Sequence, residues 1–288
     1  MRTNNEPGEL EADELELIRR AHAMLVHLAG HPGSEDPQDP SSVQAMPMVL
    51  KLPKVDTPLR HDLLAAAASA CARVCLDPRA GEEESEWAQS LKNWYGAKIR
   101  KLARRARASK WDAVLGLPGH EVDVHGAMAK AFLPGRVDGV DPRINKLQIQ
   151  GSDVPPEPGP LSTPEPDPLH PVIFVDAGLG MTVGKAAAQV GHGSMLYAAF
   201  LNPEQAIAWF ELGCPVHVRE IPAEEFAAKR AALAERHAAD AAAASSRWIT
   251  AVGGPWPAVE VRDAGHTEIA AGSATVIATS YGGQQPPR

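Results

Sequence analysis

The most regular pattern of apolar and polar positions lies between residues 172 and 200. It begins with a continuous apolar run over 172–175, which is typical of a strand that is covered on both faces. Three glycines follow between positions 178 and 184, where the backbone can adopt a positive φ or approach a ligand closely. Alanines then sustain helical spacing up to Asn202-Pro203. This stretch predicts a buried strand, a glycine-rich turn and a helix of small residues.

The pattern beyond residue 200 alternates between further helices and strands. Helices are expected over 202–212 and 223–244, and strands over 216–221, 259–262 and 274–280. Strands separated by helices predict a mixed four-stranded sheet with helices on both faces. We therefore expect residues 172–288 to form a three-layer α/β/α domain.

The first half of the chain has a mainly helical pattern. Apolar positions recur at helical spacing over 15–28 and 59–76, and an apolar stripe with two tryptophans predicts a third helix over 85–110. Residues 121–132 favour a strand or hairpin, and 147–150 a short strand. We therefore expect residues 1–152 to be a mainly helical domain with a small β appendage.

A proline-rich segment separates the two parts. Residues 153–171 hold eight prolines and almost no large apolar side chains, so they cannot form a packed core. We expect an extended, semi-rigid linker here, and we place the domain boundary in it.

Composition narrows the class of protein without fixing a function. The chain has 288 residues, 44% of them hydrophobic, and a net charge of −8, so a nucleic-acid site would have to be a local patch. Its three cysteines are too few and scattered for a disulfide framework or a zinc site, and we expect buried thiols and no metal. The acidic start and the absence of a long apolar run predict a cytoplasmic protein without membrane contact.

The helix after the glycine-rich turn carries candidate chemistry. Lys185, Gln189 and His192 are spaced i, i+4 and i+7 and therefore share one helix face. A lysine in the first turn is locally unfavourable, because the free N–H groups there already carry partial positive charge, so this site favours an anion. The alternatives from local sequence alone are a solvated lysine and a packed, hydrogen-bonded histidine.

A second feature is a run of basic residues without an acid near the end of the predicted third helix. Such a run can bind phosphate groups, or it can form a solvated face whose charge matches the helix dipole. The bases are Lys98, Arg100, Lys101, Arg104, Arg105, Arg107 and Lys110.

Two motifs resemble those of the type-2 peptidyl-tRNA hydrolase family. GLGMTVGKAAAQVGHGS, which begins at Gly178, resembles the first, and RDAGHTEIAAGS, which begins at Arg262, resembles the second. The resemblance covers about residues 170–282. It implies an α/β fold with a four-stranded sheet, hydrolysis of the ester that joins a peptide to tRNA, and no cofactor.

The resemblance also implies roles for individual residues. Lys185, Asp263 and Thr267 fall on the family's functional positions, with Gln189 and His192 on the adjoining helix face. We assign Asp263 to water orientation or base catalysis, Lys185 to developing negative charge or a terminal phosphate, and Thr267 to a hydrogen bond in the same network. From local sequence alone, Asp263 is a common turn opener.

The chain departs from the family at several positions near the expected tRNA approach. The family usually has a glycine and a lysine where this chain has Thr182 and Val183, a basic residue in place of Asp176, an acid in place of Gly178, and an arginine in place of His266. Three of these changes remove positive charge, which weakens polyanion binding. We therefore expect tRNA contacts from the basic run, Lys98, Arg100, Lys101, Arg104, Arg105 and Arg107, together with His266.

Three functions are compatible with these observations. The leading one is a peptidyl-tRNA hydrolase whose N-terminal domain adds RNA contacts. The second is a non-catalytic tRNA- or ribosome-binding module that keeps the fold, and the third is a protein-interaction scaffold. The expected partner is tRNA, with the ribosome and a second copy of the chain as further candidates.

Overall fold

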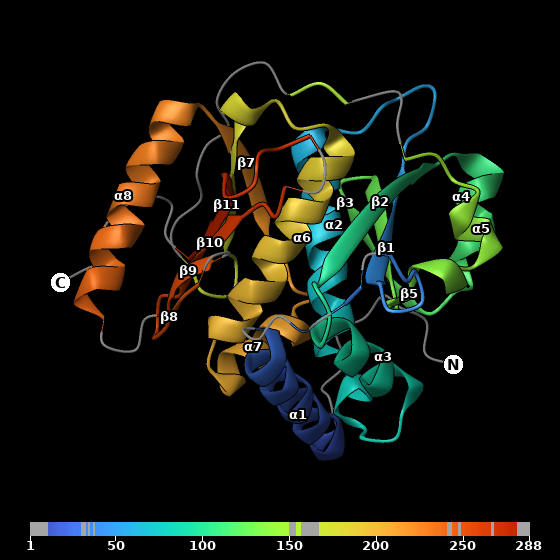
Figure 1. The fold of residues 1–288 in the computed structure, drawn as a ribbon, viewed down its shortest axis with the longest axis horizontal. Helices are drawn as coiled ribbons and strands as arrows, with labels where there is room; N and C mark the ends of the chain where they lie inside the picture. Colours follow the sequence, from blue (N-terminus) through green and yellow to red (C-terminus); the bar gives the residue numbers. More distant parts are fainter. Residues whose placement is uncertain are drawn as a thin grey trace.

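The computed structural model describes residues 11–29, 33, 35–36, 38–149, 154–156, 167–240, 244–246, 249–265 and 268–280. These residues form two β-sheets with helices between them and on their outer faces (Figure 1). In the view of Figure 1 the layers follow one another from left to right: a helix, the C-terminal sheet, two central helices, the N-terminal sheet and two short helices.

The N-terminal half contains a five-stranded sheet. Its order is β2-β1-β4-β3, with β5 also paired to β1; β1 is parallel to β2 and antiparallel to β4 and β5. Pro47, which has no backbone N–H, lies in β1 between the positions that pair with β5 and those that pair with β4. The strands are β1 (Gln44–Lys51), β2 (Arg100–Ala106), β3 (Gly119–Val124), β4 (Ala127–Phe132) and β5 (Gly135–Arg136).

The C-terminal half contains a six-stranded mixed sheet in the order β7-β6-β11-β10-β9-β8. Strands β6 and β7 are parallel, whereas the other neighbouring strands are antiparallel. The strands are β6 (Val172–Asp176), β7 (His217–Ile221), β8 (Ala244–Ser245), β9 (Ile249–Val252), β10 (Ala258–Arg262) and β11 (Ala274–Thr279).

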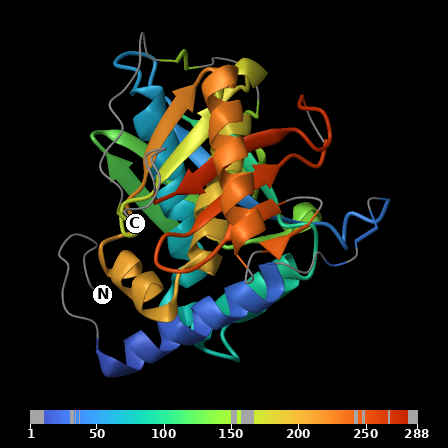
Figure 2. The same ribbon diagram turned by 90° about the vertical axis from the view of Figure 1, so that its left-hand side faces the viewer.

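Helices cover both faces of each sheet. Helix α8 lies over the outer face of the C-terminal sheet (Figure 2). Its Phe226 and Leu233 belong to the same buried apolar cluster as Phe174 of β6. Helices α2 and α6 lie side by side between the sheets, and α4 and α5 cover the outer face of the N-terminal sheet. The α-helices are α1 (Ala12–Ala29), α2 (Arg60–Leu76), α3 (Glu86–Tyr95), α4 (Ala108–Leu115), α5 (Pro142–Asn145), α6 (Val183–Phe200), α7 (Pro203–Glu211) and α8 (Ala223–Ala239).

One apolar core runs through both halves. The largest cluster of buried side chains contains Leu64 of α2, Val190 of α6 and Val276 of β11, together with residues of the N-terminal sheet. Small side chains on α2 and α6 allow the two backbones to approach closely. All three cysteines are free and buried, as predicted. In the described part of the chain, no helix is long and apolar enough to cross a membrane.

The prediction of an α/β fold with a helical N-terminal region is confirmed. All four strands predicted after residue 171 are present, and β8 and β9 extend their sheet beyond the four expected strands. The three helices predicted after residue 180 are also present, although α8 ends at Ala239. Helix α6 begins after Thr182, whose side chain caps it, and α7 begins with a capping box at Asn202.

The predicted helix over 85–110 is wrong for residues 96–107. The helix ends at Tyr95, Ile99 has a φ of 50°, and the basic residues that follow form strand β2. Burial at the start of β2 alternates from one residue to the next, as in a strand: Lys101 and Ala103 are buried, while their neighbours are partly exposed. The apolar stripe up to Trp94 is helical and buried, so only its extension beyond Gly96 failed.

The N-terminal sheet is larger than the predicted appendage. The hairpin expected over 121–132 is present as β3 and β4, but the central strand β1 was not predicted. The short strand expected at 147–150 is reduced to one bridge between Arg105 and Gln148. Most of the predicted linker lies outside the described residues; within it, Val154 is buried and its carbonyl accepts a hydrogen bond from Arg60 at 2.8 Å.

We expect the free energy of unfolding to fall as the pH is lowered from about 7.5 to about 5.5. Burial lowers the pKa of His22, His120 and His192 in the folded chain. As the pH falls below the ordinary histidine value, the unfolded chain binds more protons than the folded chain. The stabilisation is therefore complete at neutral pH and is lost on acidification.

Urea denaturation at a series of pH values measures this effect. The pKa of Asp77 is lowered to about 2, so the stabilisation by its carboxylate is lost only at more acid pH. His192→Gln should flatten the dependence, because it removes one group that takes up a proton on unfolding. A stability that stays constant over this range would contradict the prediction.

Candidate active site at the start of helix α6

An ion pair joins the first turn of α6 to the end of β10. Lys185 is the third residue of the helix, and Asp263 is the first residue after the strand. The Lys185 Nζ donates a hydrogen bond to Asp263 Oδ2, and the two side chains are 12% and 4% exposed. A pair this far from water remains favourable only if further hydrogen bonds satisfy its atoms.

Those further bonds come from Gln189, Thr275 and a loop glycine. The Gln189 Nε2 donates to Asp263 Oδ2 at 2.7 Å, and the buried Thr275 Oγ1 donates to Gln189 Oε1 at 2.7 Å. Because Thr275 occupies the amide oxygen, the amide nitrogen of Gln189 is turned toward the carboxylate. The Gly265 N–H donates to Asp263 Oδ1 at 2.7 Å, so both carboxylate oxygens are held.

The loop after β10 is shaped by the same aspartate. The backbone N–H of Asp263 donates to the Ser273 carbonyl at 2.9 Å, and the Gly272 N–H donates to the Asp263 carbonyl at 2.8 Å. Gly265 has a φ of +79°, and a Cβ there would lie 2.7 Å from the Cβ of Ala271. Only glycine fits this turn without strain, because its φ is positive and a side chain would collide with Ala271.

A carboxylate lies at the N-terminal end of α6. The Thr182 Oγ1 accepts a hydrogen bond from the Lys185 N–H at 3.3 Å, and both the Thr182 N–H and its hydroxyl donate to Glu268 Oε1 at 3.0 Å. Free N–H groups and the helix dipole favour negative charge at this end. The helix start is therefore able to hold an anion, as its sequence predicted.

His192 lies apart from this network. Within the described residues its hydrogen-bond partner is the Nζ of Lys101, 3.1 Å from His192 Nδ1, on strand β2 of the other half. Burial lowers the pKa of His192 well below its usual value, and the charges of Lys101 and Lys185 lower it further. This geometry fits a neutral, packed histidine, the alternative that local sequence offered.

The basic run predicted to bind tRNA is divided between several environments. Lys101 is only 6% exposed, lies over the Trp94 ring and has a pKa that is lowered by burial, so it cannot contact RNA at the surface. The other five side chains are partly or fully exposed and contact their own half of the chain. Lys98 and Arg100 pair with Glu35, Arg104 donates to the carbonyls of Asn145 and Leu147, Arg105 donates to Gln148, and Arg107 donates to the carbonyl of Leu52.

Two of the predicted residues, His266 and Thr267, lie outside the described residues. Two residues of the network were missed. Thr275 is a threonine within a strand and gives no signal along the sequence, because its partner Gln189 is on another element. Glu268 lies within the second motif and could have been considered as a partner of the helix start.

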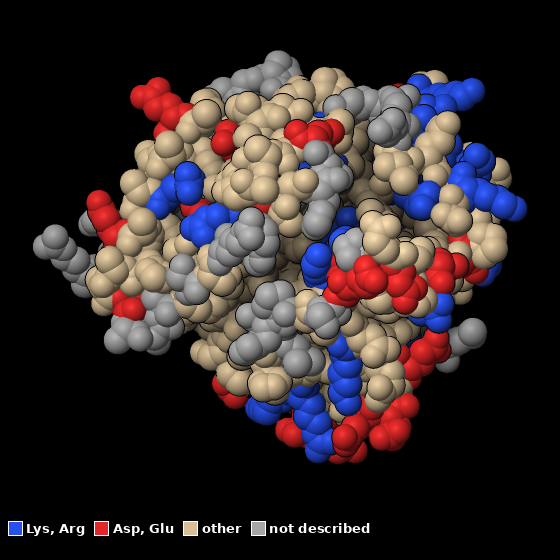
Figure 3. All heavy atoms as spheres, viewed as in Figure 1, with Lys and Arg blue, Asp and Glu red and all other residues tan. Residues whose placement is uncertain are grey.

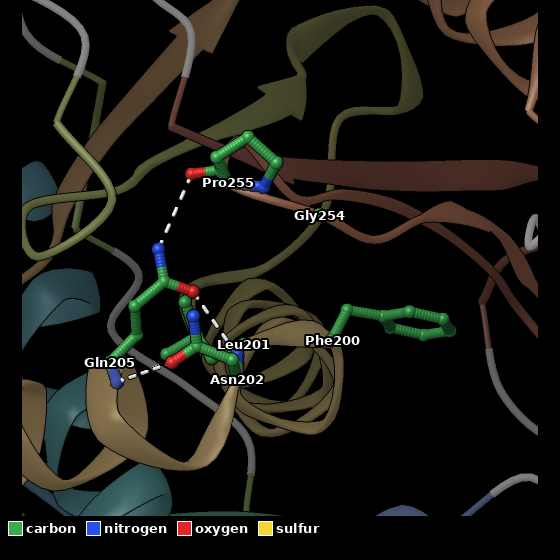
Figure 4. A pocket seen from close by; sticks show the side chains of 6 residues that line it. All are labelled: Phe200, Leu201, Asn202, Gln205, Gly254 and Pro255. Atoms are coloured by element: carbon green, nitrogen blue, oxygen red, sulfur yellow. Dashed lines mark hydrogen bonds between the residues drawn. The ribbon is translucent and has the colours of Figure 1, made fainter.

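Charge on the surface is uneven. Figure 3 shows Lys and Arg atoms gathered on the part of this face formed by α4 and α5. A hollow at the opposite end of α6 is lined by uncharged residues, among them Phe200, Asn202 and Pro255 (Figure 4). Its polar contacts are the cap of α7 and a bond from Gln205 to the Pro255 carbonyl. The described lining of this hollow carries no charged side chain, so the Lys185–Asp263 pair remains the candidate site.

Comparison with known protein families returned a match for the C-terminal segment. Residues 169–284 match the family model described as "Peptidyl-tRNA hydrolase PTH2", which covers both motifs and every residue of the network around Asp263. Comparisons with curated proteins and with solved structures returned no match. The family match does not extend to the N-terminal half, which includes β2 and the central helix α2. The match over residues 169–284 relates the C-terminal segment of this chain to the peptidyl-tRNA hydrolase PTH2 family.

Proposed function

We propose that the chain hydrolyses the ester bond of peptidyl-tRNA, releasing tRNA and peptide. The observation that carries this proposal is the network of Lys185, Gln189 and Asp263, held by Thr275 at the start of α6 in the segment that matches the family. Ester cleavage requires an oriented water and stabilisation of a tetrahedral oxyanion. The network offers a group for each task.

Asp263 orients the attacking water in this proposal. A carboxylate offers about four acceptor positions, and Lys185, Gln189 and Gly265 use three of those of Asp263. One position is then left for a water molecule. Lys185 stabilises the developing oxyanion, because an ammonium group has three N–H donors and Asp263 takes one. Thr267, by its resemblance to the family position, adds a hydrogen bond to the same network.

We propose that the tRNA also contacts the basic surface of β2, α4 and α5. Arg104 of β2 donates to Asn145, the residue before the exposed Lys146, and Arg107 follows β2 three residues before the exposed Lys110. Positive charges on adjoining elements can follow a phosphate backbone. Of the predicted RNA-binding residues, Lys98, Arg100, Arg105 and His266 remain candidates, whereas the buried Lys101 is replaced by Lys110 and Lys146.

Removal of the catalytic groups tests the reaction. Asp263→Asn and Lys185→Ala should each slow single-turnover cleavage of peptidyl-tRNA by roughly two to three orders of magnitude. The double variant should be much less impaired than the product of the single effects, because both groups act on one transition state. Arg20→Gln, on the exposed face of α1, is the matched control, and free aminoacyl-tRNA tests specificity.

Full single-turnover activity of Asp263→Asn would refute the mechanism. An unmodified protein that binds tRNA without cleaving the ester would instead favour the non-catalytic RNA-binding function. Binding and cleavage should therefore be measured on the same preparation.

Thr275 should act by positioning Gln189. Thr275→Val removes the donor to Gln189 Oε1 and leaves a buried acceptor unsatisfied, which should lower the free energy of unfolding by about 1–3 kcal/mol. The side-chain amide of Gln189 can then rotate and withdraw its N–H from Asp263, so kcat should also fall while KM changes little. Thr275→Ser keeps the hydroxyl and should restore kcat. If the valine variant loses stability without losing kcat, Thr275 has only a structural role.

The basic surface can be tested with charge-matched variants. Lys110→Gln with Lys146→Gln should weaken tRNA binding and lower the log-log salt slope by a little under about one unit for each lost phosphate contact. The control, Arg19→Gln with Arg20→Gln, removes the same charge from the solvent-facing side of α1. Equal affinity and slope in the two double variants would exclude this surface from RNA binding.

A further inference from the structure

The two halves of the chain have the same sheet topology. Strands β2-β1-β4-β3 of the N-terminal sheet correspond in order to β7-β6-β11-β10 of the C-terminal sheet. Strand β1 is parallel to β2 and antiparallel to β4, and β4 is antiparallel to β3. In the same way, β6 is parallel to β7 and antiparallel to β11, and β11 is antiparallel to β10. Strands β9 and β8 extend the C-terminal sheet beyond β10, and the two-residue β5 adds a pairing to the inner strand β1.

The helices also correspond. A long helix follows β1 and β6: α2 and α6 each cover the inner face of their own sheet. A helix on the outer face, α4 or α8, follows β2 or β7. The fourth residue of each outer helix is a buried aromatic, Trp111 in α4 and Phe226 in α8. A shorter helix, α3 or α7, precedes β2 or β7. Equivalent residues therefore do equivalent packing.

Contacts between α2 and α6 are reciprocal. Counted from the first residue of each helix, Cys71 and Ser194 are both at position 12, and Ala68 and Gly191 are both at position 9. The Cys71 Sγ donates to the Gly191 carbonyl at 3.2 Å, and the Ser194 Oγ donates to the Ala68 carbonyl at 2.8 Å. Such an exchange of partners is the mark of an isologous interface, the kind that joins two subunits about a two-fold axis.

A second reciprocal contact links each central helix to the other sheet. Ser69 and His192 are both at position 10 of their helices. The Ser69 Oγ donates to the Cys214 carbonyl just before β7 at 2.7 Å, and His192 meets Lys101 on β2. Helix α2 thus packs against β7, as α6 packs against β2.

The place of the catalytic pair is also filled in the N-terminal half. Asp62 is the third residue of α2, as Lys185 is of α6, and His125 is the first residue after β3, as Asp263 is after β10. The His125 Nδ1 lies 3.3 Å from Asp62 Oδ2, and the two side chains are 82% and 9% exposed. The start of α2 therefore carries a carboxylate at the position where α6 carries the ammonium group of Lys185.

We propose that residues 44–132 are a second copy of the fold formed by residues 172–279 and act as its built-in, non-catalytic partner subunit. The chain then works as a monomer with one hydrolytic site, at Lys185 and Asp263. The claim of a single hydrolytic site rests on the proposed function. The claim of a built-in subunit rests on topology and reciprocal contacts alone.

Mass and unfolding test the built-in subunit without any assay of activity. Light scattering on the full chain, at low and high protein concentration, should give the mass of one chain, 30.6 kDa, because the face of α6 that a second copy would use is already covered by α2. Thermal unfolding should show one cooperative transition, because the two copies share one core. A stable dimer, or two separate transitions, would overturn the proposal.

Hydrolysis tests the single site. Asp62→Asn combined with His125→Gln, in the full chain, should leave kcat and KM for peptidyl-tRNA within about twofold of the unmodified protein, whereas Lys185→Ala loses activity. A tenfold loss in the first variant, with its thermal unfolding unchanged, would show that the second site takes part in the reaction. If the unmodified protein does not hydrolyse peptidyl-tRNA, the proposed function fails, while the mass and unfolding results still decide the built-in subunit.

Discussion

The close packing of α2 on α6 is the interaction on which the rest of the structure depends. Each helix covers its own sheet with one face and meets the other helix with the opposite face, so both must be apolar nearly all round. Alanine, glycine and serine satisfy this constraint, because their small side chains let two backbones lie together between two sheets. The hydroxyl of Ser194 and the thiol of Cys71 are accommodated there because each donates to a carbonyl of the facing helix.

The candidate site is built on the end of this packed helix. Lys185 and Gln189 are one turn apart on α6, and both reach Asp263 at the end of β10, so the position of the helix on the sheet sets the geometry of the network. Arg60, in the first turn of α2, pairs with Glu220 and donates to the Met181 carbonyl at 2.6 Å, just before α6 begins. The N-terminal half therefore holds the loop that leads into α6, although this half lies outside the family match.

Periodicity along the chain was sufficient for most of the C-terminal segment. Strand β6 is almost wholly buried, and α6 and α7 begin at capping side chains, so local pattern and final structure agree there. The same reasoning failed at 96–106, where a basic, alanine-containing stretch has helical composition but pairs with β1 as a strand. Pairing with a strand fifty-five residues earlier in the sequence decides that conformation, and no local preference can show it.

The sequence by itself determined which family the C-terminal segment resembles, and it named Lys185, Gln189 and Asp263 because two motifs preserve those residue types. Only the tertiary structure decided that Thr275 fixes the amide of Gln189, that His192 belongs to the interface with β2, and that Lys101 is buried. It alone related the two halves, because strand order and reciprocal contacts depend on which elements meet in space. Contacts between distant elements can be inferred from residue types only where the contact requires one particular side chain. Packing between small residues has no such requirement.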